Sequence, residues 1–161
     1  MNQIKSKERV SQFGEVFTAP REVNAMLDLV KDECDRVDSK FLEPACGEGA
    51  FLVEILRRKL TAAHYMGGFF GYEHLSIVAV ASIFGIDIQP DNVEMARQRL
   101  FDVWLNGFYE YFGKEPSESR QSGVRMLIDR NIVCGDFLTG LTSEGEPIWF
   151  LNDNEKGVKD S

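Results

Sequence analysis

Apolar positions in the first third of the chain follow a helical spacing. In the segment 14–37, apolar side chains recur at intervals of three and four, which is typical of one helix face: Val23, Met26, Leu27 and Val30. Pro20 suits a first helical turn, and Thr18 is a candidate N-cap residue. The pattern predicts an amphipathic helix that begins close to Pro20.

Beyond this helix, short apolar runs alternate with helical stretches. Apolar runs bounded by polar residues predict strands over residues 41–42, 84–88 and 131–134. Helical spacing predicts helices over residues 50–60, 73–82 and from 90 to about 111. Loops are expected over residues 64–72 and 114–123, and a short extended piece over 147–150.

Strands that alternate with helices predict parallel pairing through right-handed crossovers. The expected fold class is therefore α/β, a partial Rossmann-like fold with a short parallel sheet flanked by helices. We expect a polar N-terminal arm over residues 1–13, an incomplete Rossmann-like domain over 14–140 and a polar C-terminal tail over 141–161.

The composition is that of an ordinary folded domain, and the net charge argues against general DNA binding by this chain. The chain has 161 residues, of which 43% are hydrophobic and 27% charged, so a packed core is expected rather than disorder. The 26 acidic residues outnumber the 18 basic ones, which gives a formal net charge of −8. Because nucleic-acid binding relies on Lys and Arg at phosphates, the chain alone is not expected to be a general DNA binder.

The cysteines and the N-terminal residues indicate the cellular compartment. Cys34, Cys46 and Cys134 are widely spaced and form no CxxC pair, which argues against a disulfide framework or a zinc site and favours a reducing, cytoplasmic setting. The first ten residues contain no apolar signal-peptide core, and no apolar run approaches the roughly 20 residues that span a membrane. We expect no membrane partner.

A glycine-containing turn follows the first predicted strand. Gly47 and Gly49 would let a ligand approach the backbone at the start of the next helix. A dinucleotide site is disfavoured because Leu52 occupies the third glycine position and Asp87 follows Gly49 by 38 positions, whereas the ribose-binding acid is expected about 20 residues on. Taken alone, the turn leaves a ligand site and a plain turn equally open.

Each predicted strand ends at an acid. Glu43, Asp87 and Asp136 close the three strands in turn, and ligands of open parallel sheets bind beyond the carboxyl ends of the strands. Carboxylates there can accept hydrogen bonds from a cationic amino group, a ribose diol and an adenine amino group. Structural alternatives remain: Glu43 could cap the following helix, Asp87 could cap the helix that begins at Pro90, and Asp136 could be a turn acid.

The motifs around these acids resemble those of a known family. FLEPACGEGAFL, GIDIQPDNVEMAR and NIVCGDFL resemble, in order, the cofactor motifs of class I S-adenosylmethionine-dependent methyltransferases. GEVFTAPREV resembles the N-terminal Phe-Thr-Pro motif of the adenine-specific DNA methyltransferases of restriction–modification systems, with Ala19 inserted between Thr18 and Pro20. The resemblance covers residues 14–139.

The resemblance implies an S-adenosylmethionine site assembled from successive segments. The methionine end would be walled by Phe17, Thr18 and Pro20. The methionine moiety would be surrounded by Glu43, Ala45, Cys46 and Gly47, with Gly49 keeping the turn open. The ribose and adenine would be bound by Asp87, Ile88, Asp136 and Phe137. Cys46 lies inside this turn, so we expect a packed thiol rather than a nucleophile.

The family's catalytic motif, Asn/Asp-Pro-Pro-Tyr/Phe, holds the flipped target base. The five prolines, at 20, 44, 90, 116 and 147, include no adjacent pair. The resemblance therefore implies the cofactor-binding portion of a DNA adenine methyltransferase, inactive alone, that meets DNA through other segments; RNA or protein substrates remain open.

A half-sheet with an unpaired edge would also favour a homo-oligomer or a docking partner. The alternative is a non-enzymatic oligomeric or regulatory remnant with a vestigial cofactor pocket. The sequence leaves open an excised fragment, the product of a truncated gene and a stand-alone protein.

Overall fold

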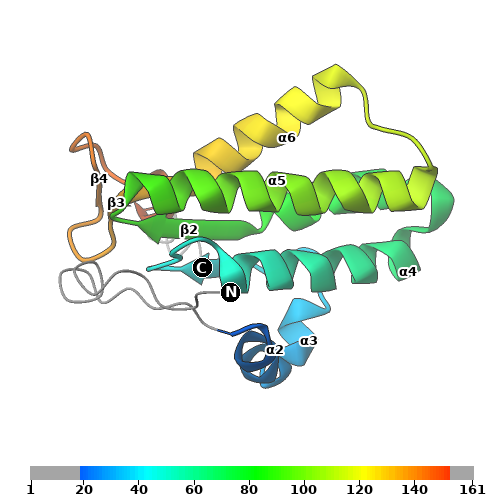
Figure 1. The fold of residues 1–161 in the computed structure, drawn as a ribbon, viewed down its shortest axis with the longest axis horizontal. Helices are drawn as coiled ribbons and strands as arrows, with labels where there is room; N and C mark the ends of the chain where they lie inside the picture. The colour runs from blue at the N-terminus through cyan, green and yellow to red at the C-terminus, as the bar shows by residue number, and fades with distance from the viewer. Residues whose placement is uncertain (1–18, 153–161) are drawn as a thin grey trace, which may run out of the picture.

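The computed structural model describes residues 19–152 (Figure 1). In this part of the chain the strands are β1 (Phe41–Glu43), β2 (Ile83–Asp87), β3 (Ile132–Asp136) and β4 (Leu141–Thr142). The helices are α2 (Pro20–Asp28), α3 (Lys31–Cys34), α4 (Ala50–Ala81), α5 (Pro90–Phe112), α6 (Glu118–Asn131) and α7 (Trp149–Asn152). The predicted α/β class is confirmed, and so are the three predicted strands, within two residues at each end.

The described strands form one sheet in the order β1-β2-β3-β4. β1, β2 and β3 are parallel, as their alternation with helices predicts, and β4 pairs antiparallel with β3. β4 was not expected, because its two residues carry no periodic pattern. Gly135 of β3 allows this pairing, since a Cβ there would stand 2.7 Å from the Leu141 carbonyl oxygen.

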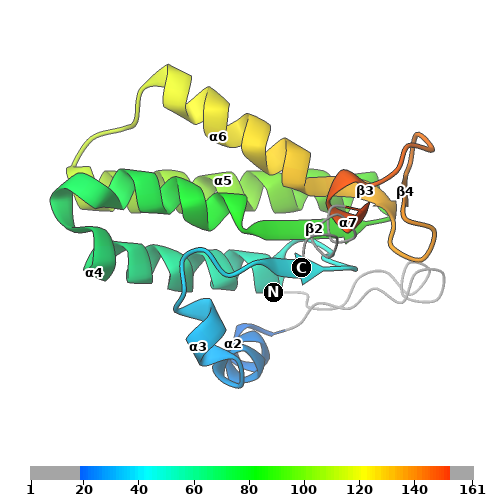
Figure 2. The same ribbon diagram turned by 180° about the vertical axis from the view of Figure 1, so that it is seen from behind.

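The two faces of the sheet have different covers (Figures 1 and 2). Side chains of one parity, such as Ile83 and Ile132, pack into the large core formed with α4, α5 and α6. Those of the other parity, Phe84 and Ile86, pack against Ile148 and residues of α7. The expected extended piece at 147–150 is thus wrong for its second half, where α7 begins.

The predicted loop over residues 64–72 is wrong, because these residues belong to α4. The helix continues through this segment and reverses direction at Gly68, whose φ of 55° and ψ of −166° are not helical. Two aromatic residues of the segment pack against the end of α5: Tyr72 stacks on Tyr111 at 4.2 Å, and His64 meets Tyr111 edge-on at 4.9 Å. Figure 2 shows the two arms of α4 side by side, joined at the end far from β1.

One further helix was not predicted, and one helix start differs from the prediction. The helix α6 was not expected; it begins inside the predicted loop 114–123, where the Ser117 side chain accepts a hydrogen bond from the Arg120 N–H. At the start of α2 the N-cap residue is Ala19, not Thr18. The expected helix at Pro90 is confirmed and ends at Phe112, followed by Gly113 in the left-handed conformation.

A buried lysine holds the segment between α3 and β1 against α4. Lys59 is fully buried, and its ammonium donates to the carbonyls of Arg36, Val37 and Ser39 at 2.7, 3.0 and 2.6 Å. Burial lowers the pKa of Lys59 to about 8. Three carbonyls that would otherwise be buried acceptors are satisfied by one side chain, so Lys59 fixes the approach of the chain to β1.

None of the helices between residues 19 and 152 combines the length and apolar character that crossing a membrane requires.

Candidate functional site at the carboxyl edge of the sheet

The turn between β1 and α4 is held against β2. The Cys46 N–H donates to the Ile86 carbonyl at 2.8 Å, and the Gly49 N–H donates to the Cys46 carbonyl at 2.9 Å. Gly49 is the N-cap residue of α4 with a φ of 84°, and a Cβ at this position would stand 3.0 Å from the Cβ of Ala96 in α5. Glycine is therefore required at position 49 both for the backbone conformation and for the approach of α5.

Asp87 joins this turn to the end of β2. Its Oδ2 accepts a hydrogen bond from the Gly47 N–H at 2.9 Å, and its Oδ1 accepts from the Gln89 N–H at 2.9 Å and from the Asn92 amide at 3.1 Å. The bonds to Gln89 and Asn92 support the start of α5, which is the capping role that the sequence left open. The bond to Gly47 goes beyond capping, because it fixes the carboxylate beside the glycine turn.

Gly47 leaves room at this point. Its φ is 54°, and apart from its two chain neighbours no described residue has an atom within 4 Å of the position that a Cβ would take. The left-handed backbone favours glycine here, and the free space lies next to the Asp87 carboxylate. A carboxylate has about four lone-pair sites and three donors reach this one, so acceptor capacity remains for a ligand.

The strand pairing places the three acids on one face of the sheet. Glu43 pairs with Gly85, which pairs with Ile132, while Asp87 pairs with Cys134. Because side chains alternate with period two, Glu43, Asp87 and Asp136 share one face. Each acid lies two residues further along than the one on the preceding strand, so Glu43 and Asp136 are roughly 16 Å apart at Cα by ideal sheet geometry.

This arrangement is a diagonal row rather than a cluster. We call the region of these three strand ends the carboxyl edge. In the described part of the chain, no group of three or more His, Cys, Asp or Glu side chains is placed to hold a metal ion. A row of separated acceptors suits an elongated ligand that carries several donor groups.

Burial raises the pKa values of two side chains at the end of β1, those of Glu43 and Cys46. Burial raises the pKa of the half-buried Glu43 carboxyl, although the Ala45 N–H, at 3.4 Å, opposes this rise. Burial together with the charges of Asp87 and Glu43 raises the pKa of Cys46 to about 12. The Cys46 thiol is therefore neutral near pH 7 and buried, in the state expected for a packed thiol.

Gly85 of β2 is a site residue that was not predicted from the sequence. A Cβ at Gly85 would stand 2.8 Å from the Leu52 side chain and 3.2 Å from the Cβ and Sγ of Cys46. The absence of a side chain on β2 thus lets the turn and the first helical turn of α4 lie directly on the sheet. Its position in the middle of an apolar strand is the sequence feature that could have indicated a close approach.

At the end of β3, the Asp136 carboxylate has fewer hydrogen-bond partners among the described residues than the Asp87 carboxylate at the end of β2. The Asp136 carboxylate accepts from the Leu138 N–H at 2.8 Å, which is the turn-acid role left open by the sequence. Phe137 beside it is 44% exposed, and Ile88, directly after β2, is 60% exposed. Two apolar side chains therefore flank the carboxyl edge without burying each other.

The structure describes only one of the three residues predicted to wall the methionine end, Pro20. Phe17 and Thr18 lie outside the described residues. Pro20 opens α2, whose Val23 and Leu27 belong to the main core. Arg58 of α4 ties α2 down through the Asp28 carboxylate at 2.8 Å.

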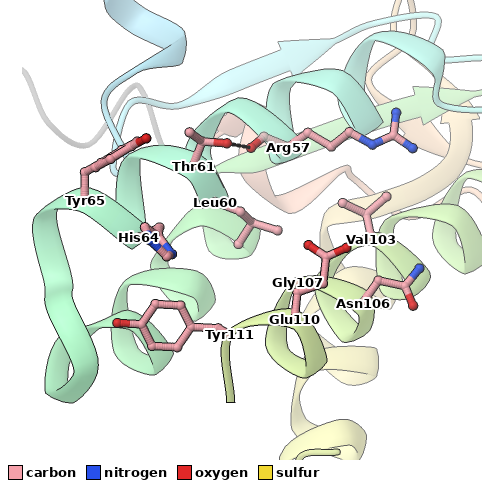
Figure 3. Close-up of a pocket in the computed structure, with 10 residues that line it drawn as sticks. All are labelled: Arg57, Leu60, Thr61, His64, Tyr65, Val103, Asn106, Gly107, Glu110 and Tyr111. Atoms are coloured by element: carbon pink, nitrogen blue, oxygen red, sulfur yellow. Dashed lines mark hydrogen bonds between the residues drawn. The ribbon is translucent and has the colours of Figure 1, made fainter. Parts of the chain in front are cut away.

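A separate hollow of about 730 Å³ lies between the first arm of α4 and α5 (Figure 3). Its walls are lined by Arg57, Leu60, Thr61, His64, Tyr65, Val103, Asn106, Gly107, Glu110 and Tyr111. Figure 3 shows His64 and Tyr111 at one end of the hollow and Arg57 and Asn106 at the other. The hollow was not predicted, because its walls come from two helices far apart in the sequence, and two of its residues, His64 and Tyr65, fall in the predicted loop.

Comparison of the chain with protein-family models, with curated proteins and with solved structures found no match.

Proposed function

We propose that the carboxyl edge binds S-adenosylmethionine and that the chain is the cofactor-binding portion of a class I methyltransferase acting on DNA adenine. The observation that carries the proposal is the Asp87 carboxylate, fixed by Gly47, Gln89 and Asn92 beside open space at a glycine turn. Consecutive parallel strands β1, β2 and β3, with their crossover helices on one face, support a Rossmann-like half-fold, since each half of that fold has this strand order.

Each proposed contact follows from the chemistry of the side chain. Asp87 accepts from the ribose hydroxyls through its remaining lone-pair capacity. Glu43 accepts from the amino group of the methionine moiety, and that cation favours the ionised carboxylate that burial otherwise disfavours. The N-terminus of α4, whose first N–H groups have no carbonyl partner within the helix, lies next to the same turn and suits the methionine carboxylate.

The apolar side chains at the edge complete the proposed site. Ile88 and Phe137 are exposed on adjacent strand ends, where they would cover the two sides of an adenine ring. Asp136 would accept from the adenine amino group. The bound cofactor would supply an activated methyl group; the residues of this chain bind and orient it.

The proposed DNA substrate depends on other segments. A chain with a net charge of −8 repels phosphates, so the DNA contacts would come from basic segments elsewhere. The sequence printed here contains no Pro-Pro pair. We therefore expect cofactor binding without methyl transfer by this chain alone.

Calorimetric titration with S-adenosylmethionine tests the proposal. The wild-type chain should bind, whereas Asp87→Asn, which keeps the side-chain shape, should weaken binding at least about tenfold. Asp102→Asn is the matched control, because Asp102 is an exposed acid on α5 that bonds to Gln98. NAD and ATP serve as comparison ligands.

The possible results separate the hypotheses. Binding of S-adenosylmethionine that Asp87→Asn leaves unchanged would contradict the assigned site. Tighter binding of NAD would contradict the assigned cofactor. If the folded wild-type chain binds none of the three ligands, the cofactor proposal fails and the non-enzymatic module remains.

A further inference from the structure

The bend of α4 exposes a group of large apolar side chains. Tyr65, Met66, Phe69 and Phe70, which we name the α4 tip, are 82%, 68%, 67% and 97% exposed, respectively. They lie on both sides of Gly68, at the end of the molecule away from the carboxyl edge (Figures 1 and 2). Monomeric proteins rarely present so much contiguous apolar surface unless it binds a partner.

Hollows lie on both sides of the base of the α4 tip. One is the hollow between α4 and α5. The other, of about 420 Å³, is lined by Lys31, Asp35, Arg58, Thr61, Ala62 and Tyr65. Thr61 and Tyr65, one helical turn apart, line both hollows and form a ridge between them. A ridge flanked by grooves is the shape that helices use to pack on one another.

The exposed area points to a protein partner rather than a small molecule. At about 200 Å² for a fully exposed side chain of this size, the α4 tip presents roughly 600 Å². A standard interface buries about 800 Å² on each partner, so the α4 tip and the neighbouring hollows together supply an area of that order. A ligand inside the hollow between α4 and α5 would leave most of Phe70 uncovered.

We propose that the α4 tip forms a homodimer interface, in which Phe70 of each copy enters the hollow between α4 and α5 of the other copy. A two-fold interface uses the same patch on both copies, so a projection and a hollow must lie side by side. Tyr65 belongs to both features and thereby joins them. The rings of His64 and Tyr111, packed edge-on at 4.9 Å, offer an aromatic wall for the incoming phenyl ring.

The α4 tip is uncharged, which suits an apolar contact, whereas the net charge of each copy opposes association. Residues 65–72 carry no charged side chain, whereas each copy has a net charge of −8. Association would be apolar and opposed by general repulsion, so added salt should strengthen it. An anionic membrane surface fits this tip poorly, because the tip contains no basic residue.

Sedimentation velocity on the full 161-residue chain over a concentration series tests the proposal. The wild type should form dimers with a micromolar Kd that decreases as salt increases. Phe70→Glu should raise the Kd roughly a hundredfold or more, because a two-fold contact loses the same aromatic anchor twice. Leu138→Glu is the matched control: Leu138 is 91% exposed but lies at the opposite end of the molecule, and its substitution should leave the Kd unchanged.

A pair of variants tests the reciprocal geometry. Thr61→Arg places a long cation at the ridge and should also prevent dimerisation. A mixture of Phe70→Glu and Thr61→Arg copies should recover heterodimers, because one contact is then native and the other pairs the new Glu with the new Arg. Circular dichroism confirms that each variant is folded.

Several results would overturn the inference. These are a monomeric wild type at the highest concentration, a dimer that Phe70→Glu leaves intact, the absence of recovery in the mixture, and binding of the α4 tip to neutral lipid vesicles in place of self-association. None of them bears on S-adenosylmethionine binding at the carboxyl edge, so the two proposals fail separately.

Discussion

Asp87 and Gly85, two residues apart on β2, separate what a sequence can indicate at the residue scale from what it cannot. Asp87 was predicted from its place at the end of an apolar run, and the structure places its carboxylate 2.9 Å from the Gly47 N–H. Gly85 was not predicted, because the reason for it is contact with Leu52 and Cys46, which belong to a different segment. Terminal acids follow from local pattern, whereas close approaches follow from packing.

Replacing Gly85 by Ala should lower the free energy of unfolding by about 1–3 kcal/mol, because the new methyl group overpacks a buried contact. Gly123→Ala is the matched control on the exposed face of α6, where the new Cβ would meet no atom within 4 Å outside its chain neighbours and the adjacent helix backbone. That substitution should instead raise the free energy of unfolding by about 0.5–1 kcal/mol, through helix propensity. Urea denaturation measures both, and equal effects of the two variants would contradict the packing at Gly85.

Glu43 gives a pH-dependent prediction. Burial raises its pKa in the folded chain above the ordinary 4.5. The folded state therefore binds more protons than the unfolded state between pH 4.5 and the raised value. The contribution of the Glu43 carboxyl to the free energy of unfolding is fully present below pH 4.5. It is lost as the pH rises from 4.5 through the raised pKa.

Glu43→Gln cannot ionise, so the variant should gain stability relative to the wild type as the pH rises from about 4 to about 7. Thermal denaturation across this range measures the difference. A difference that stays constant with pH would show that the Glu43 carboxyl is not perturbed by burial. S-Adenosylmethionine should reduce the difference if its ammonium group pairs with Glu43.

At the scale of elements, periodicity predicted the long, regular parts and failed at their junctions. α5 was predicted almost to the residue, because Pro90 opens it and an apolar stripe follows. The loop over 64–72 was wrong because glycines and aromatic residues are also found in loops, and their packing against α5 is not visible in the local sequence. The whole of α6 was missed although Ser117 is a favoured N-cap residue, since the first turns after it are polar.

Lys59 offers a prediction for the junction between α3 and β1. Lys59→Met keeps much of the apolar stem but leaves the carbonyls of Arg36, Val37 and Ser39 without their donor. Unsatisfied buried acceptors are costly, so the free energy of unfolding should fall by about 2–4 kcal/mol.

Lys40→Met is the matched control for Lys59→Met, because Lys40 is exposed at the same junction. Its effect should stay within about 0.5 kcal/mol. Guanidinium denaturation compares the two variants. Equal losses would mean that the ammonium of Lys59 does not hold this segment.

For the whole molecule, alternation of strands and helices was enough to predict a parallel α/β sheet, but not how its two faces are covered. One face packs on α4, α5 and α6. The crossovers α4 and α5 follow from the predicted element order, whereas α6 was not predicted. The other face packs on residues around Ile148 and Phe150, where the weak apolar pattern predicted a short extended piece and not the helix α7. The domain boundary at residue 140 stays a prediction, yet chain beyond it contributes to the core.

The contribution of this last segment can be measured. Ile148 is 1% exposed and packs with Phe84, Ile86 and Phe150, so Ile148→Ala should lower the free energy of unfolding by about 2–4 kcal/mol, with the same cooperativity as the wild type. Leu138→Ala removes an exposed apolar side chain only ten positions earlier and should change stability by less than about 0.5 kcal/mol. If both variants lower the free energy of unfolding by the same small amount, residues 148–152 do not stabilise the second face of the sheet. A large loss confined to Ile148→Ala would show that this face depends on the segment that follows β4.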